Sequence, residues 1–394
     1  MTLFQTPQLD LEDSLVLDEI HRVRDELSDT LRTPRRWTGK LRRHNEARAI
    51  RGSNSIEGYN VDLDDAIAAV EDERPLSADE ETFVAIVGYR LALGYVLATA
   101  DDPTATIDHS TVRTLHYMML SHDLSKSPGR YREREIFVHD EKTDEIAYIG
   151  PQGEDVNALM AEFVDQLGTT HSGDPFIDAA MAHLNLVMIH PFRDGNGRMA
   201  RCLQTLVLAR RGVTEPLFSS IEEWLGRNTD DYYKALSVVG QGAWHPENDA
   251  SLWLKFCLRA HHMQGQTQLR RIQWAIRLGD EATQLIEDMG LPERTFDALY
   301  EAMVGLKVRR QRYVDSAQID QRTATRDLTE LSKAGLLVPR SQTRGRYYVA
   351  GDELRRRAMS ARRGLPGLSD PCPGFIEALR ARETPNPLAG NAPT

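Results

Sequence analysis

Side chains suited to phosphate chemistry gather between His190 and Arg201, in the run HPFRDGNGRMAR. The segment Gly195–Gly197 favours a tight turn, because glycine adopts backbone angles that other residues avoid. The residues from Arg198 onward favour a helix. A glycine-rich turn that enters a helix presents free N–H groups at the positive end of the helix dipole, which suits an anion. We therefore predict an anion-binding turn here.

The charged residues around this turn complete a reactive site. Arg198 and Arg201 are three residues apart, so they project from one side of the predicted helix and can hold phosphate oxygens. Asp194 can hold Mg²⁺ shared with phosphates. His190 ends an apolar helix and is the natural proton acceptor at neutral pH. This set of residues predicts a phosphate-transfer enzyme.

The same run resembles the Fic domain motif, His-x-Phe-x-(Asp/Glu)-Gly-Asn-Gly-Arg-x-x-Arg, at every specified position. The resemblance covers about residues 45–270. It implies a helical core and transfer of AMP from ATP to a Ser, Thr or Tyr hydroxyl of a protein, with release of pyrophosphate. In that scheme His190 accepts the hydroxyl proton, Asp194 positions Mg²⁺, and Phe192 anchors the loop. The phosphate-binding residues would be Gly195, Asn196, Gly197, Arg198 and Arg201.

An upstream segment resembles the inhibitory helix of this family. Ser53, Glu57 and Gly58 match its pattern (Ser/Thr)-x-x-x-Glu-(Gly/Asn), and they precede the catalytic motif in the same chain. Taken alone, the segment is also typical of a solvated helix end. The resemblance implies that Glu57 pairs with Arg201, takes the place of the γ-phosphate and keeps adenylylation low. In some relatives this glutamate supports removal of AMP, and the sequence leaves that activity open.

Two short apolar runs, 136–138 and 146–149, flank the polar residues 140–144 and predict a β-hairpin. It resembles the Fic flap, which lies over the active site and binds the target backbone by strand addition. The residues assigned to target binding are Ile136, Phe137, Val138 and Tyr148.

Tyr232 and Tyr233 resemble the family's Tyr-Tyr-x-Ala-Leu element, whose rings help to enclose adenine. Ordinary packing explains either tyrosine equally well. His183 lies two helical turns before His190. It has no further ligands at metal spacing, so we interpret it as structural.

The predicted fold is mainly α, with a Fic-type helical core, a hairpin flap and a C-terminal winged-helix domain. Periodic apolar residues predict helices over 11–32, 62–72, 78–99, 107–120 and 175–189. The predicted organisation is a helical region with the inhibitory helix (1–105), the catalytic core (106–275), the winged helix-turn-helix (280–355) and a largely disordered tail (356–394), which is rich in Arg, Pro and Gly.

The winged-helix prediction depends on a change of pattern after residue 280. Helical patterns near 292–297, 313–315 and 320–331 precede two short strands around 344–349. Asp320 is the expected N-cap of the third helix. Arg322 and Arg326 lie on that helix, where contacts to DNA would be made, and the Arg344–Arg346 turn forms the predicted wing tip. A protein-interaction module of the same shape is the equal alternative.

Composition and charge describe an ordinary globular protein of 394 residues with a net charge of −11, which argues against binding nucleic acid over the whole surface. The three cysteines lack the spacing of a disulfide framework or a zinc site, so a reducing cytoplasm is expected. The first residues lack the pattern of a signal peptide, and no segment approaches the roughly 20 apolar residues needed to span a bilayer, so no membrane association is expected.

Two other functions stay open at this point. A Fic-like core can transfer UMP, phosphate or phosphocholine, although the intact Gly-Asn-Gly turn and the second arginine favour AMP. Alternatively, the chain is a DNA-binding regulator whose core senses nucleotide. The sequence also does not decide the identity of the target or the trigger that releases Glu57. It leaves open whether the protein modifies itself and whether it forms a homodimer.

Overall fold

The protein is described by a computed structural model that divides into two compact units. The core unit consists of residues 1–30, 44–266 and 369–394, and the second unit consists of residues 31–43 and 267–368. The structure describes residues 3–140, 143–169, 173–213, 215, 219–341 and 346–383.

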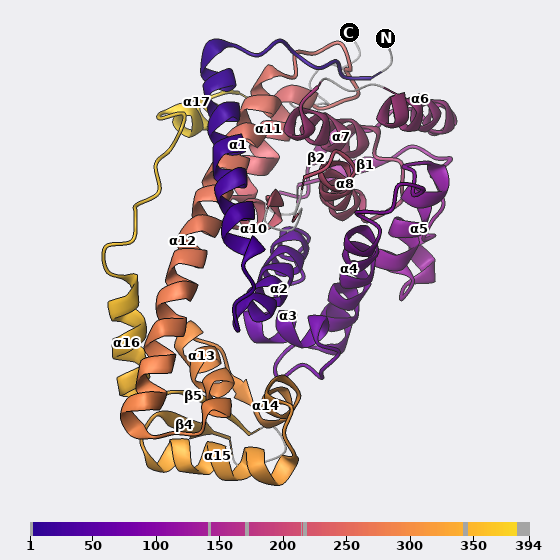
Figure 1. Ribbon diagram of the computed structural model, residues 1–394. Coiled ribbons are helices and arrows are strands. Elements are labelled where there is room, and N and C mark those ends of the chain that lie inside the picture. Colours follow the sequence, from indigo (N-terminus) through magenta and orange to yellow (C-terminus); the bar gives the residue numbers. More distant parts are fainter. Residues whose placement is uncertain are drawn as a thin grey trace. The chain divides into compact units, whose positions relative to one another are not determined.

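Helices dominate the core unit (Figure 1). The helices predicted over 11–32, 62–72, 78–99, 107–120 and 175–189 are confirmed as α1, α3, α4, α5 and α7. The elements are α1 (Leu11–Arg32), α2 (Thr38–Ile56), α3 (Leu63–Val70), α4 (Glu80–Ala98), α5 (His109–Leu120), β1 (Phe137–His139), β2 (Ile146–Ile149), α6 (Val156–Thr169), α7 (Pro175–Ile189), α8 (Asn196–Arg210), α10 (Glu222–Arg227), α11 (Thr229–Gly240), α12 (Ser251–Met289) and α17 (Phe375–Arg380). Of these, α1, α2 and α12 run from one unit into the other.

Helices α7 and α8 lie side by side and carry the motif at their junction (Figure 1). Asp174 caps α7 by accepting hydrogen bonds from the N–H groups of Phe176 and Ile177, and Pro175 fits the first helical position. Most side chains of both helices are buried. The junction is thus held between two core helices, which fixes the residues that it carries.

Helix α4 corrects the expectation that no segment is apolar enough to span a bilayer. Among the described residues, Glu80–Ala98 passes that test by length and composition. One face of α4, including Ile86, Tyr89 and Leu93, is buried, and the helix contacts α3, α5 and α8. Core helices of other proteins pass the same test, so this one helix is weak evidence for a membrane span.

The predicted hairpin is present as an antiparallel pair of strands, β1 and β2, in which Val138 is opposite Tyr148. A register irregularity follows Val138. On its other side β2 bridges to Ala243, and the N–H of Ile149 donates to the carbonyl of Gly242. The Tyr148 hydroxyl donates to the Met188 carbonyl at 2.7 Å, so the hairpin is attached to α7. Residues 141 and 142 of the connecting turn lie outside the described residues.

The second unit combines helices with a three-stranded antiparallel sheet of order β3-β5-β4. Asp320 caps α15 through the N–H groups of Arg322 and Thr323, as predicted. Residues 344 and 345 of the predicted wing tip lie outside the described residues. The elements are α13 (Phe296–Val304), β3 (Val308–Arg309), α14 (Arg310–Ala317), α15 (Gln321–Lys333), β4 (Leu337–Arg340), β5 (Tyr347–Ala350) and α16 (Asp352–Arg362).

Two expectations about the ends of the domains are corrected. Residues 356–383 of the predicted disordered tail complete α16 and contain α17, whose Ile376 and Leu379 are buried, and residues 384–394 lie outside the described residues. The composition was misleading because several arginines there form ion pairs, such as Arg357 with Glu281 and Arg380 with Asp231. The predicted boundary at residue 105 is also absent, since residues 44–266 share one unit.

Candidate functional site

His190 ends α7 in the left-handed backbone conformation, with φ of 51°. Its Nδ1 lies 3.1 Å from the Val187 carbonyl oxygen, which can only accept, so Nδ1 carries the proton and Nε2 keeps a lone pair. Burial lowers the pKa of His190 to about 4. The ring is therefore neutral at physiological pH and able to accept a proton, as general-base catalysis requires.

The turn after His190 is built around Gly195, whose φ of 74° is readily adopted by glycine. The Asn196 side chain accepts from the Phe192 N–H and donates to the Phe192 carbonyl, both at 2.9 Å, which closes the loop. Helix α8 starts at Asn196, so Asn196 and Gly197 belong to its first turn and only Gly195 is the left-handed residue. The first N–H groups of α8 lack intrahelical acceptors, and they are the groups that the sequence predicts to bind an anion.

Phe192 is fully buried, as its predicted anchoring role requires. It stacks on His116 of α5 with ring centroids 3.6 Å apart and planes 4° from parallel. His116 accepts from the Gly129 N–H through Nδ1, so Nε2 donates to the Asp194 carbonyl at 2.9 Å. Burial lowers the pKa of His116 to about 4, which keeps this arrangement neutral. No sequence pattern singled out His116, because its contacts reach residues distant in the chain.

Arg198 and Arg201 are the two arginines of the motif, and both are almost fully buried. The Nε and Nη1 atoms of Arg198 and the Nη1 atom of Arg201 are buried without a hydrogen-bond partner among the described residues. The Arg198 guanidinium lies over the Tyr59 ring, 5.1 Å from its centroid. Buried guanidinium N–H groups without acceptors are costly, so this pair fits an anionic ligand.

Glu57 lies directly beside the anion-binding turn. Its Oε1 accepts from Arg201 Nη2 at 2.6 Å, so the predicted pair is present. A Cβ added to Gly197 would lie 2.4 Å from the same oxygen, which shows how closely the carboxylate approaches the turn. Burial alone would lower the pKa of Arg201, but Glu57 raises it above its ordinary value.

Ser53 strengthens the attachment of α2 to α8. Arg201 donates from Nε to Ser53 Oγ at 2.8 Å and from Nη2 to the Ser53 carbonyl at 2.9 Å. Close backbone packing supports the same helix: a Cβ on Gly52 would lie 2.5 Å from the Glu222 carbonyl oxygen of α10. Gly58, with φ of 81°, follows the end of α2. Ser53 and Glu57 of the inhibitory pattern therefore both contact Arg201, and Gly58 follows the end of their helix.

Asp194 is the predicted magnesium ligand. In the structure its Oδ2 lies 3.0 Å from Lys126 Nζ, and its Oδ1 accepts from the Gly195 N–H. Burial alone would raise the pKa of Asp194, but Lys126 holds it below its usual range. No group of three or more metal-binding side chains occurs among the described residues. A single ionised carboxylate fits Mg²⁺ when substrate phosphates supply the other ligands.

The two tyrosines assigned to adenine occupy different environments. Tyr232 is buried, and its hydroxyl contacts His183 Nε2 at 3.0 Å, whereas Tyr233 is 45% exposed and donates to the Ile56 carbonyl of α2. His183 also contacts Gln204, so its structural interpretation agrees with a buried polar network. The structure thus places Tyr232 in the core and leaves Tyr233 beside α2.

The residues assigned to target binding lie in different environments on the two strands of the hairpin. Phe137 is 45% exposed on β1, whereas Tyr148 on β2 points its hydroxyl at α7. Because β2 pairs with β1 on one side and bridges to Ala243 on the other, β1 provides the outer edge of this pair in the described chain. Ile136 and Val138 are half-buried along that edge. The edge suits an added strand.

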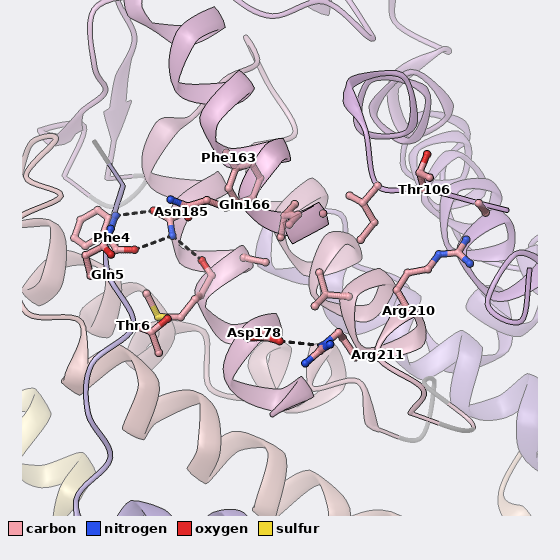
Figure 2. Close-up of a pocket in the computed structure, with 17 residues that line it drawn as sticks. Phe4, Gln5, Thr6, Thr106, Phe163, Gln166, Asp178, Asn185, Arg210 and Arg211 are labelled. Atoms are coloured by element: carbon pink, nitrogen blue, oxygen red, sulfur yellow. Dashed lines mark hydrogen bonds and ion pairs between the residues drawn. The ribbon is translucent and has the colours of Figure 1, made fainter. Parts of the chain in front are cut away.

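A cavity of about 610 Å³ lies elsewhere in the core unit (Figure 2). Its lining includes Phe4, Asn185 and the pair Arg211–Asp178, whose atoms Nε and Oδ2 are 2.9 Å apart. These residues belong to the N-terminal segment, to α7 and to the end of α8 that is farthest along the chain from Gly195. None of the motif residues 190–201 lines this cavity.

Comparison with known proteins agrees with this geometry. Residues 106–208 match the model of the Fic/DOC family. Residues 106–208 of this chain are therefore similar to a Fic domain. The matched region contains α7, the motif and most of α8, which are the elements that hold the site.

Two curated relatives are named protein adenylyltransferase Fic. The one from Nematostella vectensis is 31% identical over 248 residues, which are 61% of this chain and 54% of the relative. The one from Culex quinquefasciatus is 29% identical over 199 residues, 49% of this chain and 37% of the relative. A Fic family protein from Desulfovibrio desulfuricans G20 has a similar fold, with a TM-score of 0.54 and 20% identity over 89% of this chain and 99% of that one. The chain thus spans about half the length of its first curated relative, or less than half of the second.

Proposed function

We propose that the protein transfers AMP from ATP to a protein hydroxyl. The observation that supports this best is the pair of buried arginines, Arg198 and Arg201, whose unpartnered nitrogens lie at the start of α8. An anion with several oxygens would satisfy both guanidinium groups and the free N–H groups together. The names of the curated relatives support the same activity.

In the proposed reaction, His190 Nε2 accepts the proton of a Ser, Thr or Tyr hydroxyl. The oxygen then attacks the α-phosphorus of ATP, the bond between the α-phosphorus and the bridging oxygen breaks, and pyrophosphate leaves with the electron pair. The Val187 carbonyl holds Nδ1–H and so keeps Nε2 free for this transfer. A histidine whose tautomer is fixed by such a bond is ready to act as a base.

The first turn of α8 and its arginines would bind the phosphates. The N–H groups near Asn196 and Gly197 lie at the N-terminal end of α8, and this end of a helix attracts negative charge. Arg201 Nη1 has no hydrogen-bond partner among the described residues. Asp194 would hold Mg²⁺, which when bound offsets charge that builds on the leaving phosphates. Lys126 neutralises the same carboxylate in the structure, so it must move or share Asp194 with the metal.

Glu57 would then inhibit the enzyme by occupying the position of a phosphate oxygen. Its carboxylate already satisfies Arg201 Nη2 and lies against Gly197, so a γ-phosphate has to displace it. Nucleotide that binds without displacing Glu57 would have its α-phosphate misaligned with His190. Removal of AMP supported by the same glutamate would be a separate activity, and loss of the α-label from modified protein after addition of the native chain would detect it.

The target would bind along the outer edge of β1. Phe137 and His139 are exposed there, and the strand's pairing with β2 leaves its other edge to accept a main chain. Strand addition would bring a target hydroxyl to a fixed register relative to His190. The proposed target is a protein. In a purified sample that contains no other protein, the reaction can be measured as self-modification.

Incubation with ATP labelled at the α-phosphate or at the γ-phosphate tests this function and separates it from transfer of other groups. The full chain with Glu57→Gly should acquire the α-label and not the γ-label. Acquisition of the γ-label would indicate phosphate transfer. Absence of both labels, with ATP, UTP and a choline donor alike, would contradict a transferase function.

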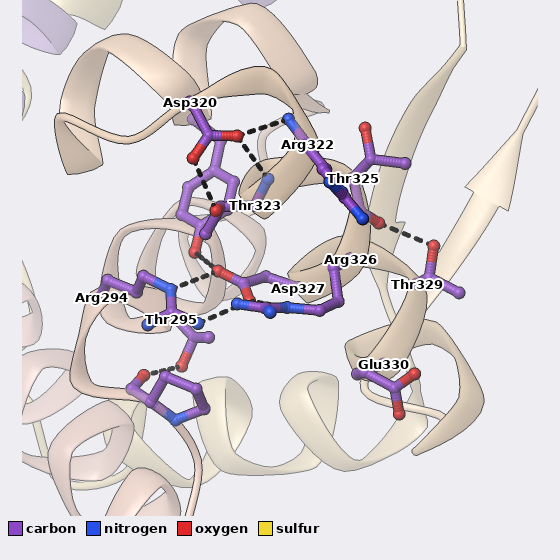
Figure 3. Close-up of polar contacts among 12 residues, drawn as sticks. Arg294, Thr295, Asp320, Arg322, Thr323, Thr325, Arg326, Asp327, Thr329 and Glu330 are labelled. Carbon is purple, nitrogen blue, oxygen red and sulfur yellow. Dashed lines mark hydrogen bonds and ion pairs between the residues drawn. The ribbon is translucent and has the colours of Figure 1, made fainter.

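A second proposal concerns the second unit, which we interpret as a winged helix-turn-helix that binds DNA. Its order of elements, α13-β3-α14-α15-β4-β5, supports this interpretation. Helix α15 is oriented by buried Asp327, which accepts from Arg294 at 2.6 and 2.9 Å (Figure 3). Its exposed residues are suited to the major groove, since arginines, an amide and threonine methyl groups all read base edges or phosphates: Gln321, Arg322, Thr325, Arg326 and Thr329.

Titration with duplex DNA at several salt concentrations tests this proposal. Replacing Arg322 and Arg326 by alanine should weaken binding and reduce the slope of log K against log salt by about one unit for each lost phosphate contact. Arg355→Ala, an exposed arginine on α16, is the matched control. No binding at low salt would instead support a protein-interaction module.

A further inference from the structure

Arg132 is a buried arginine that none of the proposed steps uses. It lies between the end of α5 and β1, and only 8% of it is exposed. The partners that the described residues supply to its guanidinium are all backbone carbonyl oxygens. Nε donates to His190, Nη1 to Arg134, and Nη2 to Pro151 and Ile189, at 2.8, 2.7, 2.8 and 3.2 Å.

These carbonyls belong to two separate elements. Ile189 and His190 form the C-terminal end of α7, where helix carbonyls lack intrahelical donors. Arg134 precedes β1 and Pro151 follows β2, so they are the two stems of the hairpin. The N–H of Arg132 itself donates to the Pro191 carbonyl at 2.8 Å. One side chain therefore joins both stems of the hairpin to the residue proposed as the base.

We propose that Arg132 is a positioning residue, which fixes the hairpin that receives the target and the backbone of His190 in one geometry. This inference rests on the proposed AMP transfer. A strand added to β1 would place its hydroxyl relative to the hairpin, while the proton acceptor is carried by α7. The transfer needs both within hydrogen-bond reach, and an error of about 1 Å can cost roughly 10²-fold in rate.

The chemistry of the site requires an arginine. A guanidinium has five N–H donors in a rigid plane, whereas a lysine ammonium has three on a flexible stem. Four carbonyls from two elements converge on that plane, which an ammonium cannot satisfy together. The space around Gly150 is filled on both sides: a Cβ there would lie 2.7 Å from Ile136 Cγ2 and 2.9 Å from Arg132 Nη2. Gly150→Ala therefore crowds both the guanidinium and Ile136 while the arginine is retained.

The activity test uses the full chain with Glu57→Gly as reference, and adds Arg132→Lys, Arg132→Met or Gly150→Ala. The measured quantities are the rate of self-modification at saturating Mg-ATP, the ATP concentration for half-maximal rate, and the melting temperature. We expect the rate to fall by about 10²-fold for the two Arg132 variants, and less for Gly150→Ala, with the ATP dependence unchanged. Arg259→Lys, which alters a largely buried arginine paired with Asp370, is the matched control.

A lower melting temperature with an unchanged rate for the folded fraction would overturn the proposal, since Arg132 would then serve stability alone. Amide hydrogen exchange in the chain with native Glu57 gives a readout that does not need activity. Arg132→Lys should accelerate exchange in residues 146–149 and 187–190 together, and Arg259→Lys in neither. Acceleration in only one segment, or in none, would refute the joint positioning. If Glu57→Gly itself transfers no AMP, the proposed function fails, and hydrogen exchange still decides this inference.

Discussion

Replacing Glu57 by glycine should raise AMP transfer well above that of the native chain. The carboxylate accepts from Arg201 Nη2 at 2.6 Å, and the Arg201 side chain is 0% exposed whereas that of Glu57 is 24% exposed. A charge-assisted hydrogen bond of this kind contributes about 1.5–3 kcal/mol, and water on the exposed side of Glu57 favours the lower part of that range. Because about 1.4 kcal/mol corresponds to tenfold, the productive complex should become roughly 10- to 10²-fold more populated.

The assay is the initial rate of α-label incorporation at saturating Mg-ATP, with ATP affinity measured separately. The gain should appear mainly in the rate, because removal of the carboxylate allows the γ-phosphate to contact Arg201 and aligns the α-phosphate. Glu57→Gly combined with Arg201→Ala should lose the gain. Asp370→Asn removes a carboxylate from another arginine pair at 2.6 Å and should leave the rate unchanged. Equal rates for the native chain and Glu57→Gly would refute the reasoning.

Three further predictions concern individual side chains. His190→Ala should slow transfer by about 10²–10⁴-fold while ATP still binds, and a variant as fast as its parent would exclude His190 as the base. Asp194→Asn should raise the Mg²⁺ concentration needed for half-maximal rate, and an unchanged Mg²⁺ dependence would contradict its role. Burial lowers the pKa of His183 to about 3 and of His116 to about 4, below the unfolded value of about 6.5. The unfolded chain binds those protons first, so the free energy of unfolding from urea titrations should fall as pH decreases from about 6.5 towards 4; greater stability at the lower pH would refute this.

Much of the core unit follows from local patterns in the sequence. Apolar residues at helical spacing predicted α1 over 11–32, where the structure has Leu11–Arg32. The β-rich runs around 136–138 and 146–149 predicted the hairpin within about one residue. Such patterns succeed because helices and strands bury residues at fixed spacings, which can be seen in a short stretch of sequence. The contact of Glu57 with Arg201 could also be predicted, but only from the family resemblance and not from a local pattern.

Other parts of the site could not be predicted, because their function depends on residues far apart in the chain. His116 stacks on Phe192, and Arg132 donates to carbonyls of α7, yet neither residue has a local signature. Lys126 belongs to a polar segment of the kind that is usually exposed to solvent, but in the structure it pairs with Asp194. The C-terminal arginines are typical of a disordered segment, and the sequence alone does not show which carboxylates pair with them. Tertiary contacts supply the missing information in each case.

We propose that His190, the α8 turn and its arginines transfer AMP under restraint by Glu57. Intact-mass measurement after incubation with Mg-ATP tests it most directly, with the full chain carrying Glu57→Gly compared with the same chain also carrying His190→Ala. We predict covalent addition of AMP to the first protein, and at least about 10²-fold less to the second in the same incubation time. Unmodified protein in both samples, with added candidate targets also unmodified, would contradict the claim, as would equal modification of both.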